Sequence, residues 1–366
     1  MVILKKMNKW MFMILVVFII TLVTACSNEE TSSNSPDEAE NETTEDSSND
    51  SNEAKEENEA NGVEAITINI AHGNQPDEPV GQLAQKWKEL AEERSDGALE
   101  LNLYPSSQLG SEKDVLEQAM MGNNVIVMAG YDFLMDYVPD AGILTAPYLV
   151  EDFDELLYLT ETEWYESLVD DLNGEGIDIV TTRTVYGERH LLTNEEVQTP
   201  ADLEGKSIRV PNNQMSIETF EAMGASATPT PLGDLYTSLQ QGLVDGAENP
   251  LPVLQGVKAQ EVSKHLALTG HQKFITAWIG GTSYLETLPE DLVQILKETG
   301  DEAGDYARGI LDEETKSVLA EFEEEGVEIY EVDQEPFRES VQEVYNSFPS
   351  WTPGLYDQIQ ELLESR

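Results

Sequence analysis

The chain has 366 residues, of which 72 are acidic and 20 are basic, so its formal net charge is −52. A surface of this charge repels phosphate groups, which argues against nucleic acid as a partner and against anionic membranes without a covalent anchor. The single cysteine excludes an internal disulfide and a thiolate metal cluster.

Residues 1–25 have the pattern of a signal peptide. Three lysines precede an uncharged run of 16 residues from Trp10 to Ala25. Because a helix that spans a membrane needs about 20 apolar residues, we expect cleavage, with a retained transmembrane helix as the alternative. The next residue is Cys26, and Leu22-Val23-Thr24-Ala25-Cys26 resembles the lipobox of bacterial lipoproteins. This resemblance implies that Cys26 is lipidated and anchors the protein to the outer face of the cell membrane.

Residues 26–62 form an acidic segment behind that cysteine. Between positions 27 and 62 there are 13 acidic residues, one lysine and no aromatic residue. Such a segment buries too little apolar surface to offset its chain entropy, so we predict a disordered tether. An acidic interaction tail is the alternative. Without the signal's lysines and the tether, residues 63–366 carry −43.

The first part of the folded region alternates between predicted strands and helices. Alternating β-branched residues predict strands, and apolar positions three or four apart predict helices. The expected elements, in chain order, are strand 66–72, helix 79–94, strand 99–104, helix 113–121 and strand 125–129. This order predicts a parallel sheet covered by helices on both faces.

The same alternation returns in the second part of the chain. The expected elements are strands 176–186, 206–210 and 244–248 and helical stretches 214–223, 233–241, 289–319 and 340–348. We therefore predict two α/β domains joined by a long strand and a long helix. The first comprises residues 63–186 plus about 276–314, the second residues 187–275 plus about 315–345, and 346–366 form a C-terminal helical segment.

Motifs for catalysis and for metal binding are missing from the sequence. There is no G-x-S-x-G, G-x-G-x-x-G, P-loop or H-E-x-x-H, and the four histidines stand apart at positions 72, 190, 265 and 271. The sequence therefore predicts a protein that is not an enzyme and that carries no cofactor and no metal.

The scarce basic residues are more informative than the abundant acids. Only seven arginines occur, and Arg189 and Arg209 stand 20 residues apart near the predicted domain crossing. A guanidinium group matches a carboxylate with two parallel donors, so arginines in a cleft could hold an organic acid. Ion pairs with nearby acidic residues are the alternative. Asn249, which precedes Pro250, could donate to a ligand oxygen or simply form a turn.

Three segments resemble one family, the DctP-type solute receptors of TRAP transporters. They are YPSSQLG (104–110), ADLEGKSIRVPNN (201–213) and MGASATPTPLGDLYTSLQQGLVDGAENP (223–250), and the similarity covers about residues 64–350. The resemblance implies a two-domain receptor of the Venus-flytrap type, like periplasmic binding proteins, with a long helix that runs across both domains. The domains would close around a small carboxylate-bearing solute, which is then delivered to membrane permease subunits.

The resemblance also assigns roles to residues. Arg209 occupies the place of the arginine that pairs with the ligand carboxylate, Arg189 that of a second arginine, and Asn249 that of a ligand-bonding asparagine. Asn212 is an expected secondary contact. Tyr131, His72 and Trp278 are further candidates for the cleft, with a place in the core as the alternative for each.

The ligand stays open between a C4-dicarboxylate and a sugar acid. Receptors of the sialic-acid branch have an acidic residue after the strand at 125–129, where this chain has Ala129-Gly130-Tyr131. That difference argues against sialic acid. The alternatives for the whole protein are a solute-binding lipoprotein of an ABC importer or sensory system, a secreted enzyme and a structural surface lipoprotein.

Overall fold

The computed structural model describes residues 65–366. The predicted signal peptide, the lipidated Cys26 and the acidic tether lie outside the described residues. Within the described part, no helix has both the length and the apolar character needed to cross a membrane.

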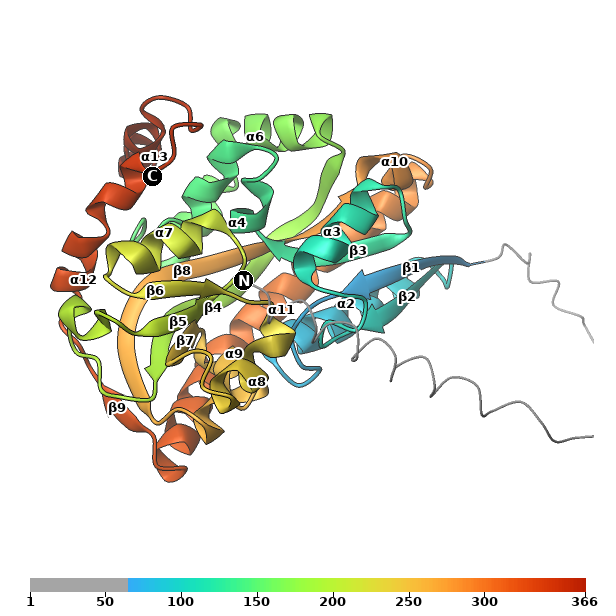
Figure 1. Cartoon of the computed structure of the whole chain (residues 1–366). Coiled ribbons are helices and arrows are strands. Elements are labelled where there is room, and N and C mark those ends of the chain that lie inside the picture. Colours follow the sequence, from blue (N-terminus) through green and yellow to red (C-terminus); the bar gives the residue numbers. More distant parts are fainter. Residues whose placement is uncertain (1–64) are drawn as a thin grey trace, which may run out of the picture. The chain divides into compact units, whose positions relative to one another are not determined.

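A single mixed β-sheet organises residues 65–366, with the strand order β2-β1-β3-β8-β4-β7-β5-β6 and with β9 paired to β8 (Figure 1). The strands are β1 (Ile66–Ala71), β2 (Leu99–Tyr104), β3 (Val125–Gly130), β4 (Ile177–Thr193), β5 (Ser207–Val210), β6 (Ser226–Pro229), β7 (Gly246–Asn249), β8 (His265–Gly281) and β9 (Glu328–Tyr330). We call the part built on β1–β3 the first lobe and the part built on β5–β7 the second lobe. The long strands β4 and β8 belong to both lobes.

The predicted parallel pairing is confirmed within each lobe, but the sheet as a whole is mixed. Strands β1, β2 and β3 pair in parallel within the first lobe, as do β5, β6 and β7 within the second. However, β8 runs antiparallel to both β3 and β4, and β4 runs antiparallel to β7. The reason is β8 itself, a strand that the sequence analysis missed and that carries the chain back from the second lobe to the first.

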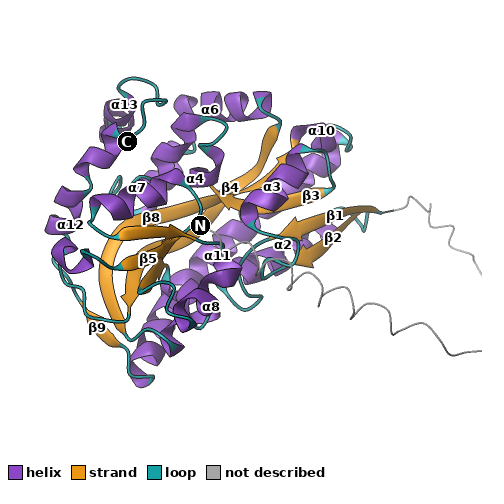
Figure 2. Ribbon diagram, viewed as in Figure 1, coloured by secondary structure: helices purple, strands orange, loops and turns teal. Residues whose placement is uncertain are grey.

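Helices cover both faces of the sheet (Figure 2). The α-helices are α2 (Pro79–Arg94), α3 (Glu112–Met120), α4 (Tyr131–Leu134), α5 (Phe153–Leu159), α6 (Glu163–Gly174), α7 (Gln214–Ala222), α8 (Leu235–Gln240), α9 (Leu251–Gly256), α10 (Thr282–Leu285), α11 (Glu290–Glu324), α12 (Glu335–Ser340) and α13 (Leu355–Glu364). Helix α2 has the predicted bounds, because Pro79 stands at its first turn and Leu83, Trp87 and Ala91 form one buried stripe.

The 35-residue helix α11 joins the cores of the two lobes. Its first half buries Leu296 and Ala303 in a cluster with α2 and β1, and its second half buries Val318 and Phe322 in a cluster with α8 and α9. The helix passes close to β4 at Gly304, where an added Cβ would lie 2.5 Å from the backbone oxygen of Arg183. The predicted long helix across both domains is therefore confirmed.

Both predicted domain crossings fall inside continuous strands. Position 187 coincides with an irregularity in the pairing of β4 with β8, where Gly187 has a φ of 132° that a side chain would strain. Thr276 pairs with Thr184 in the middle of β8. The domain bounds given above stay predictions.

Candidate functional site

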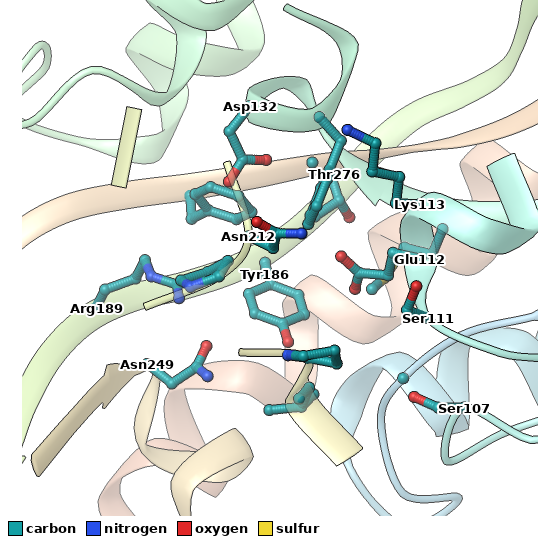
Figure 3. Close-up of a pocket in the computed structure, with 18 of the residues that line it drawn as sticks. Ser107, Ser111, Glu112, Lys113, Asp132, Tyr186, Arg189, Asn212, Asn249 and Thr276 are labelled. Atoms are coloured by element: carbon teal, nitrogen blue, oxygen red, sulfur yellow. The ribbon is translucent and has the colours of Figure 1, made fainter. Parts of the chain in front are cut away.

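A cavity of about 700 Å³, including its part open to solvent, lies between the two lobes (Figure 3). It is formed where β1 and β3 of the first lobe and β5 and β7 of the second lobe reach their carboxyl ends, the usual place for a ligand in an α/β sheet. Its polar lining residues are Ser107, Ser111, Glu112, Lys113, Asp132, Tyr186, Arg189, Arg209, Asn212, Asn249 and Thr276.

Arg189 is fixed at one side of this cavity by a buried ion pair. Its Nε and Nη2 donate to the two carboxylate oxygens of Glu248 at 2.6 and 2.7 Å, and its guanidinium lies 4.9 Å from the centre of the Phe274 ring. His271 Nε2 lies 3.3 Å from the same carboxylate. Burial raises the pKa of Glu248, but Arg189 and His271 outweigh it and hold that pKa well below its usual range. The positive charge of Arg189 is thus already compensated.

Arg209 lies on β5 and has no carboxylate partner among the described residues. Its Nε and Nη2 both donate to the backbone oxygen of Thr230, at 2.8 and 2.5 Å, while Nη1 is buried without any hydrogen-bond partner. Burial, together with the nearby charge of Arg189, lowers the pKa of Arg209 to about 10. The cavity therefore contains a fixed, under-compensated cation with a free donor edge.

Two carboxyl groups of the first lobe face the arginines. Glu112 is the first residue of α3, and Asp132 follows the end of β3. Burial raises the pKa of each carboxyl group to about 7. Repulsion from Asp132 raises the pKa of Glu112 further, whereas the charge of Arg189 works against the rise for Asp132. Near neutral pH these groups both donate and accept hydrogen bonds, which suits ligand hydroxyl groups.

The position of Asp132 depends on close packing. Its Oδ2 accepts a 2.6 Å hydrogen bond from Asn213 of the second lobe, while its Oδ1 is buried without a partner. A Cβ added at Gly130 would lie 2.1 Å from that Oδ1 and 2.6 Å from the ring of Phe274. Only glycine at position 130 lets the Asp132 carboxyl approach the strand end so closely.

Strands β4, β7 and β8 supply further polar groups. The Tyr186 hydroxyl accepts a 3.2 Å hydrogen bond from Asn74, and the Oγ1 of Thr276 is buried without a partner. In Figure 3, Arg189 and Asn249 lie on one side of the Tyr186 ring and Glu112 on the other. A ligand in this space faces both lobes at once.

Four of the seven predicted ligand residues line the cavity, namely Arg189, Arg209, Asn212 and Asn249. The structure therefore brings together the two arginines and the two asparagines from three separate segments, at β4, at β5 with the loop after it, and at β7. Whether they contact the solute stays a prediction.

The other three predicted residues lie outside the lining of this cavity. Tyr131 is fully buried, and its hydroxyl is 2.6 Å from that of Tyr165. Trp278 packs at 5.4 Å against Trp87 in the core of the first lobe. His72 is buried against Trp278 and borders only a much smaller neighbouring cavity, and burial lowers its pKa to about 4. All three have the core positions that the sequence analysis kept as the alternative.

Sequence reasoning missed several groups at the site, above all Glu112, Asp132, Tyr186 and Thr276. The expectation that no acidic residue follows β3 at the cavity is wrong, because Asp132, one position after Tyr131, lines it. Asp132 comes directly after a strand and Glu112 starts a helix after one, so the rule that ligands bind beyond strand ends could have identified both.

The described residues contain no group of acids, histidines and cysteines that could hold a metal ion.

Comparison with known proteins agrees with this geometry. Residues 70–350 match the model of the family "Bacterial extracellular solute-binding protein, family 7" (DctP). The sialic acid-binding periplasmic protein SiaP of Vibrio cholerae is 31% identical over 73% of this chain and 83% of its own.

Two solved TRAP periplasmic solute binding proteins have the same fold. The one from Ochrobacterium anthropi, with bound L-fuconate, is 42% identical with a TM-score of 0.80 and covers 82% of this chain and 99% of its own. The one from Actinobacillus succinogenes, with bound L-galactonate, is 38% identical with a TM-score of 0.81 and covers 82% and 100%. This chain therefore belongs to the DctP family of extracytoplasmic solute receptors of TRAP transporters.

Proposed function

We propose that this receptor binds a hydroxylated monocarboxylate, a sugar acid of about six carbons, and delivers it to the membrane permease of a TRAP transporter. The observation that carries the proposal is the free donor edge of Arg209, a buried cation without a carboxylate partner among the described residues. A solute carboxylate at this edge supplies the missing charge. Charge-assisted hydrogen bonds of this kind contribute about 1.5–3 kcal/mol each.

The charge balance of the cavity favours one carboxylate over two. Among the cations that line it, Arg189 is paired with Glu248, and the Lys113 ammonium is 2.7 Å from Asp136. Of the three cations that line the cavity, Arg209 alone lacks a carboxylate partner among the described residues. A C4-dicarboxylate would bring a second anionic group to a wall that already contains Glu112 and Asp132, which is electrostatically unfavourable.

The remaining walls suit a chain of hydroxyl groups. Glu112, Asp132, Asn212, Asn249 and Thr276 present carboxyl, amide and hydroxyl groups around the cavity. Each hydroxyl of a sugar acid both donates and accepts, so it can bond to any of these groups. The L-fuconate and L-galactonate bound by the two solved relatives are sugar acids of this kind.

Lobe closure couples this recognition to transport. A solute that touches Glu112 of the first lobe and Arg209 of the second contacts both only when the lobes are closed, so it stabilises the closed form. The closed form is then the one that the permease recognises. This role requires no bond to be broken in the solute, which is why we propose a receptor without enzymatic activity.

A thermal-shift screen of the purified protein tests the proposed ligand class. We expect L-galactonate, L-fuconate and D-galacturonate to raise the melting temperature more than succinate or sn-glycerol 3-phosphate at equal concentration, because a solute that binds only the folded state stabilises it. A larger shift with succinate would favour the C4-dicarboxylate reading, and a larger shift with the phosphate ester would favour a phosphate receptor.

We further propose that Cys26 carries the lipid that holds the receptor at the outer face of the cell membrane. The support is the apolar run that ends at Ala25 directly before this cysteine. The variant Cys26→Ala is expected to lose metabolic labelling with palmitate and either to appear in the medium or to keep its signal peptide. Undiminished labelling of that variant would contradict the anchor.

A further inference from the structure

A second cavity adjoins the solute cavity between the lobes. It has a volume of about 640 Å³, including its part open to solvent, and it shares Gly73 and Leu232 with the first. Its side-chain lining includes Gln75 and Ser106 of the first lobe and Tyr236 of the second. Two cavities that share wall residues are separated by those residues.

Leu232 forms the second-lobe side of this wall. It is the first residue of a short 3-10 turn, Leu232–Asp234, directly before α8. Its side chain packs against the apolar cores of both lobes, which makes it an apolar bridge across the cleft.

Gly73 forms the first-lobe side of the wall. A Cβ added at this glycine would lie 3.4 Å from the Cδ2 of Leu232, so the two residues leave no room for a solute between them. Gly233 and Ser107, which are next to this pair, are nearly as close, since a Cβ added at Gly233 would lie 3.9 Å from the side chain of Ser107. The partition thus consists of one apolar side chain held against a glycine backbone.

We propose that Leu232 determines solute length, by closing the second cavity to any acid longer than a single sugar unit. The inference rests on the proposed sugar-acid function and adds a residue that sets the upper size of the solute. Truncation of Leu232 joins the two cavities, and the joined space takes the second sugar of a disaccharide acid while Arg209 still holds the carboxylate.

The chemistry of the second cavity fits an uncharged sugar, because its one charged lining residue, Lys258, is exposed and lies 3.9 Å from Glu261. Ser106 Oγ donates to Gln75 Oε1 at 2.8 Å, which leaves the Gln75 amide N–H groups as donors. The Tyr236 hydroxyl donates to Glu261 at 3.2 Å and accepts from the Gln240 amide at 3.3 Å, which leaves its second lone pair as an acceptor. Neutral amide and hydroxyl groups bind sugar hydroxyls without the cost of burying a charge.

Two matched ligand pairs test the proposal by titration calorimetry: D-gluconate with lactobionate, and D-galacturonate with the disaccharide acid galacturonosyl-rhamnose. In each pair the longer acid carries one more sugar. For the pair whose shorter acid binds, we expect the wild-type protein to prefer the shorter acid at least about 100-fold. In Leu232→Ala the preference falls to about 10-fold or less, while Leu232→Met, which keeps the side-chain volume, retains it.

Two results would overturn the role of Leu232. One is wild-type protein that binds the longer acid as tightly as the shorter one, and the other is an unchanged preference in Leu232→Ala. If circular dichroism shows that Leu232→Ala is unfolded, Leu232→Val takes its place. We then expect a preference between that of the wild-type protein and a tenfold ratio, and an unchanged preference would contradict the role of Leu232. Absence of binding of both shorter acids to the wild-type protein would overturn this inference, and absence of binding of L-galactonate and L-fuconate as well would also reject the proposed function.

Discussion

Replacement of Arg209 by alanine removes the one cation of the cavity that lacks a carboxylate partner in the described chain. In the wild-type protein, Nε and Nη2 hold the backbone oxygen of Thr230, and Nη1 is left for the solute. The Thr230 bonds fix the plane of the guanidinium and thereby the direction of the free edge. The alanine variant loses both the charge and this orientation.

The magnitude follows from the bonds that the solute carboxylate loses. One to two charge-assisted hydrogen bonds amount to about 3 kcal/mol, since each contributes about 1.5–3 kcal/mol. Because 1.4 kcal/mol corresponds to a tenfold change, the dissociation constant of the best-bound sugar acid is expected to rise about 100-fold. Titration calorimetry measures this ratio, and near-ultraviolet circular dichroism checks that the variant is folded.

Arg183→Ala is the matched control, because it removes the same charge from the same pair of lobes. Arg183 lies on β4 outside the cavity and pairs with Asp305 at 2.9 Å. Its replacement is expected to change the affinity by no more than about twofold, since exposed pairs contribute little. A folded Arg209→Ala variant that binds within tenfold of the wild-type protein would refute the proposed role of this arginine.

Two further predictions concern stability. Burial raises the pKa of Glu78 from 4.5 to about 8, so its carboxyl group binds a proton more tightly in the folded state than in the unfolded state. The stability that this difference contributes is fully present below about pH 4.5 and is lost as the pH rises to about 8. In urea titrations, Glu78→Gln, at the residue directly before α2, is expected to flatten the fall of the unfolding free energy between pH 5 and 8. Glu89→Gln, at an exposed hydrogen bond on α2, is the control and is expected to keep the wild-type slope. Equal slopes for the wild-type protein and both variants would contradict this prediction. Gly304→Ala places a methyl group 2.5 Å from a backbone oxygen and is expected to destabilise the protein by about 1–3 kcal/mol, whereas Gly309→Ala, in open space on the same helix, stabilises it by about 0.5–1 kcal/mol. Similar urea midpoints for these two variants would contradict the close approach of α11 to β4.

Local sequence patterns predicted most of the parallel strands but only about half of the helices, and α4, α5, α6, α9 and α10 were not predicted. Helix α2 and strand β2 have the expected bounds, because a proline start and clear apolar periodicities define them within a single segment. Strand β8 was missed because its 17 residues are buried along almost their whole length, so no alternation of polar and apolar residues marks it. Its antiparallel pairing with β3 and β4 depends on partners between 72 (Thr193 with His265) and 154 (Ile126 with Gly280) residues away, which no local pattern contains.

Rare residue types and family motifs predicted the arginines and asparagines of the site, but not its acidic residues. Arginines are scarce in this chain, so Arg189 and Arg209 were conspicuous, and both line the cavity. Acidic residues are abundant, so residue type alone does not distinguish Glu112 and Asp132 from the other 70 of the 72 acids, and only their positions after predicted strands could have marked them. The aromatic candidates Tyr131 and Trp278 lie in the core, because residues at strand ends can point to either face and only packing decides which.

The most direct test of the central claim compares a sugar acid with the alcohol that lacks its carboxylate. Titration calorimetry of the purified protein with L-galactonate and galactitol, or with L-fuconate and L-fucitol, changes that group and leaves the other hydroxyls in place. We predict micromolar or tighter binding of at least one of these acids, and at least about 100-fold weaker binding of its alcohol, as expected for a solute held by Arg209. Equal affinity for acid and alcohol would contradict the account.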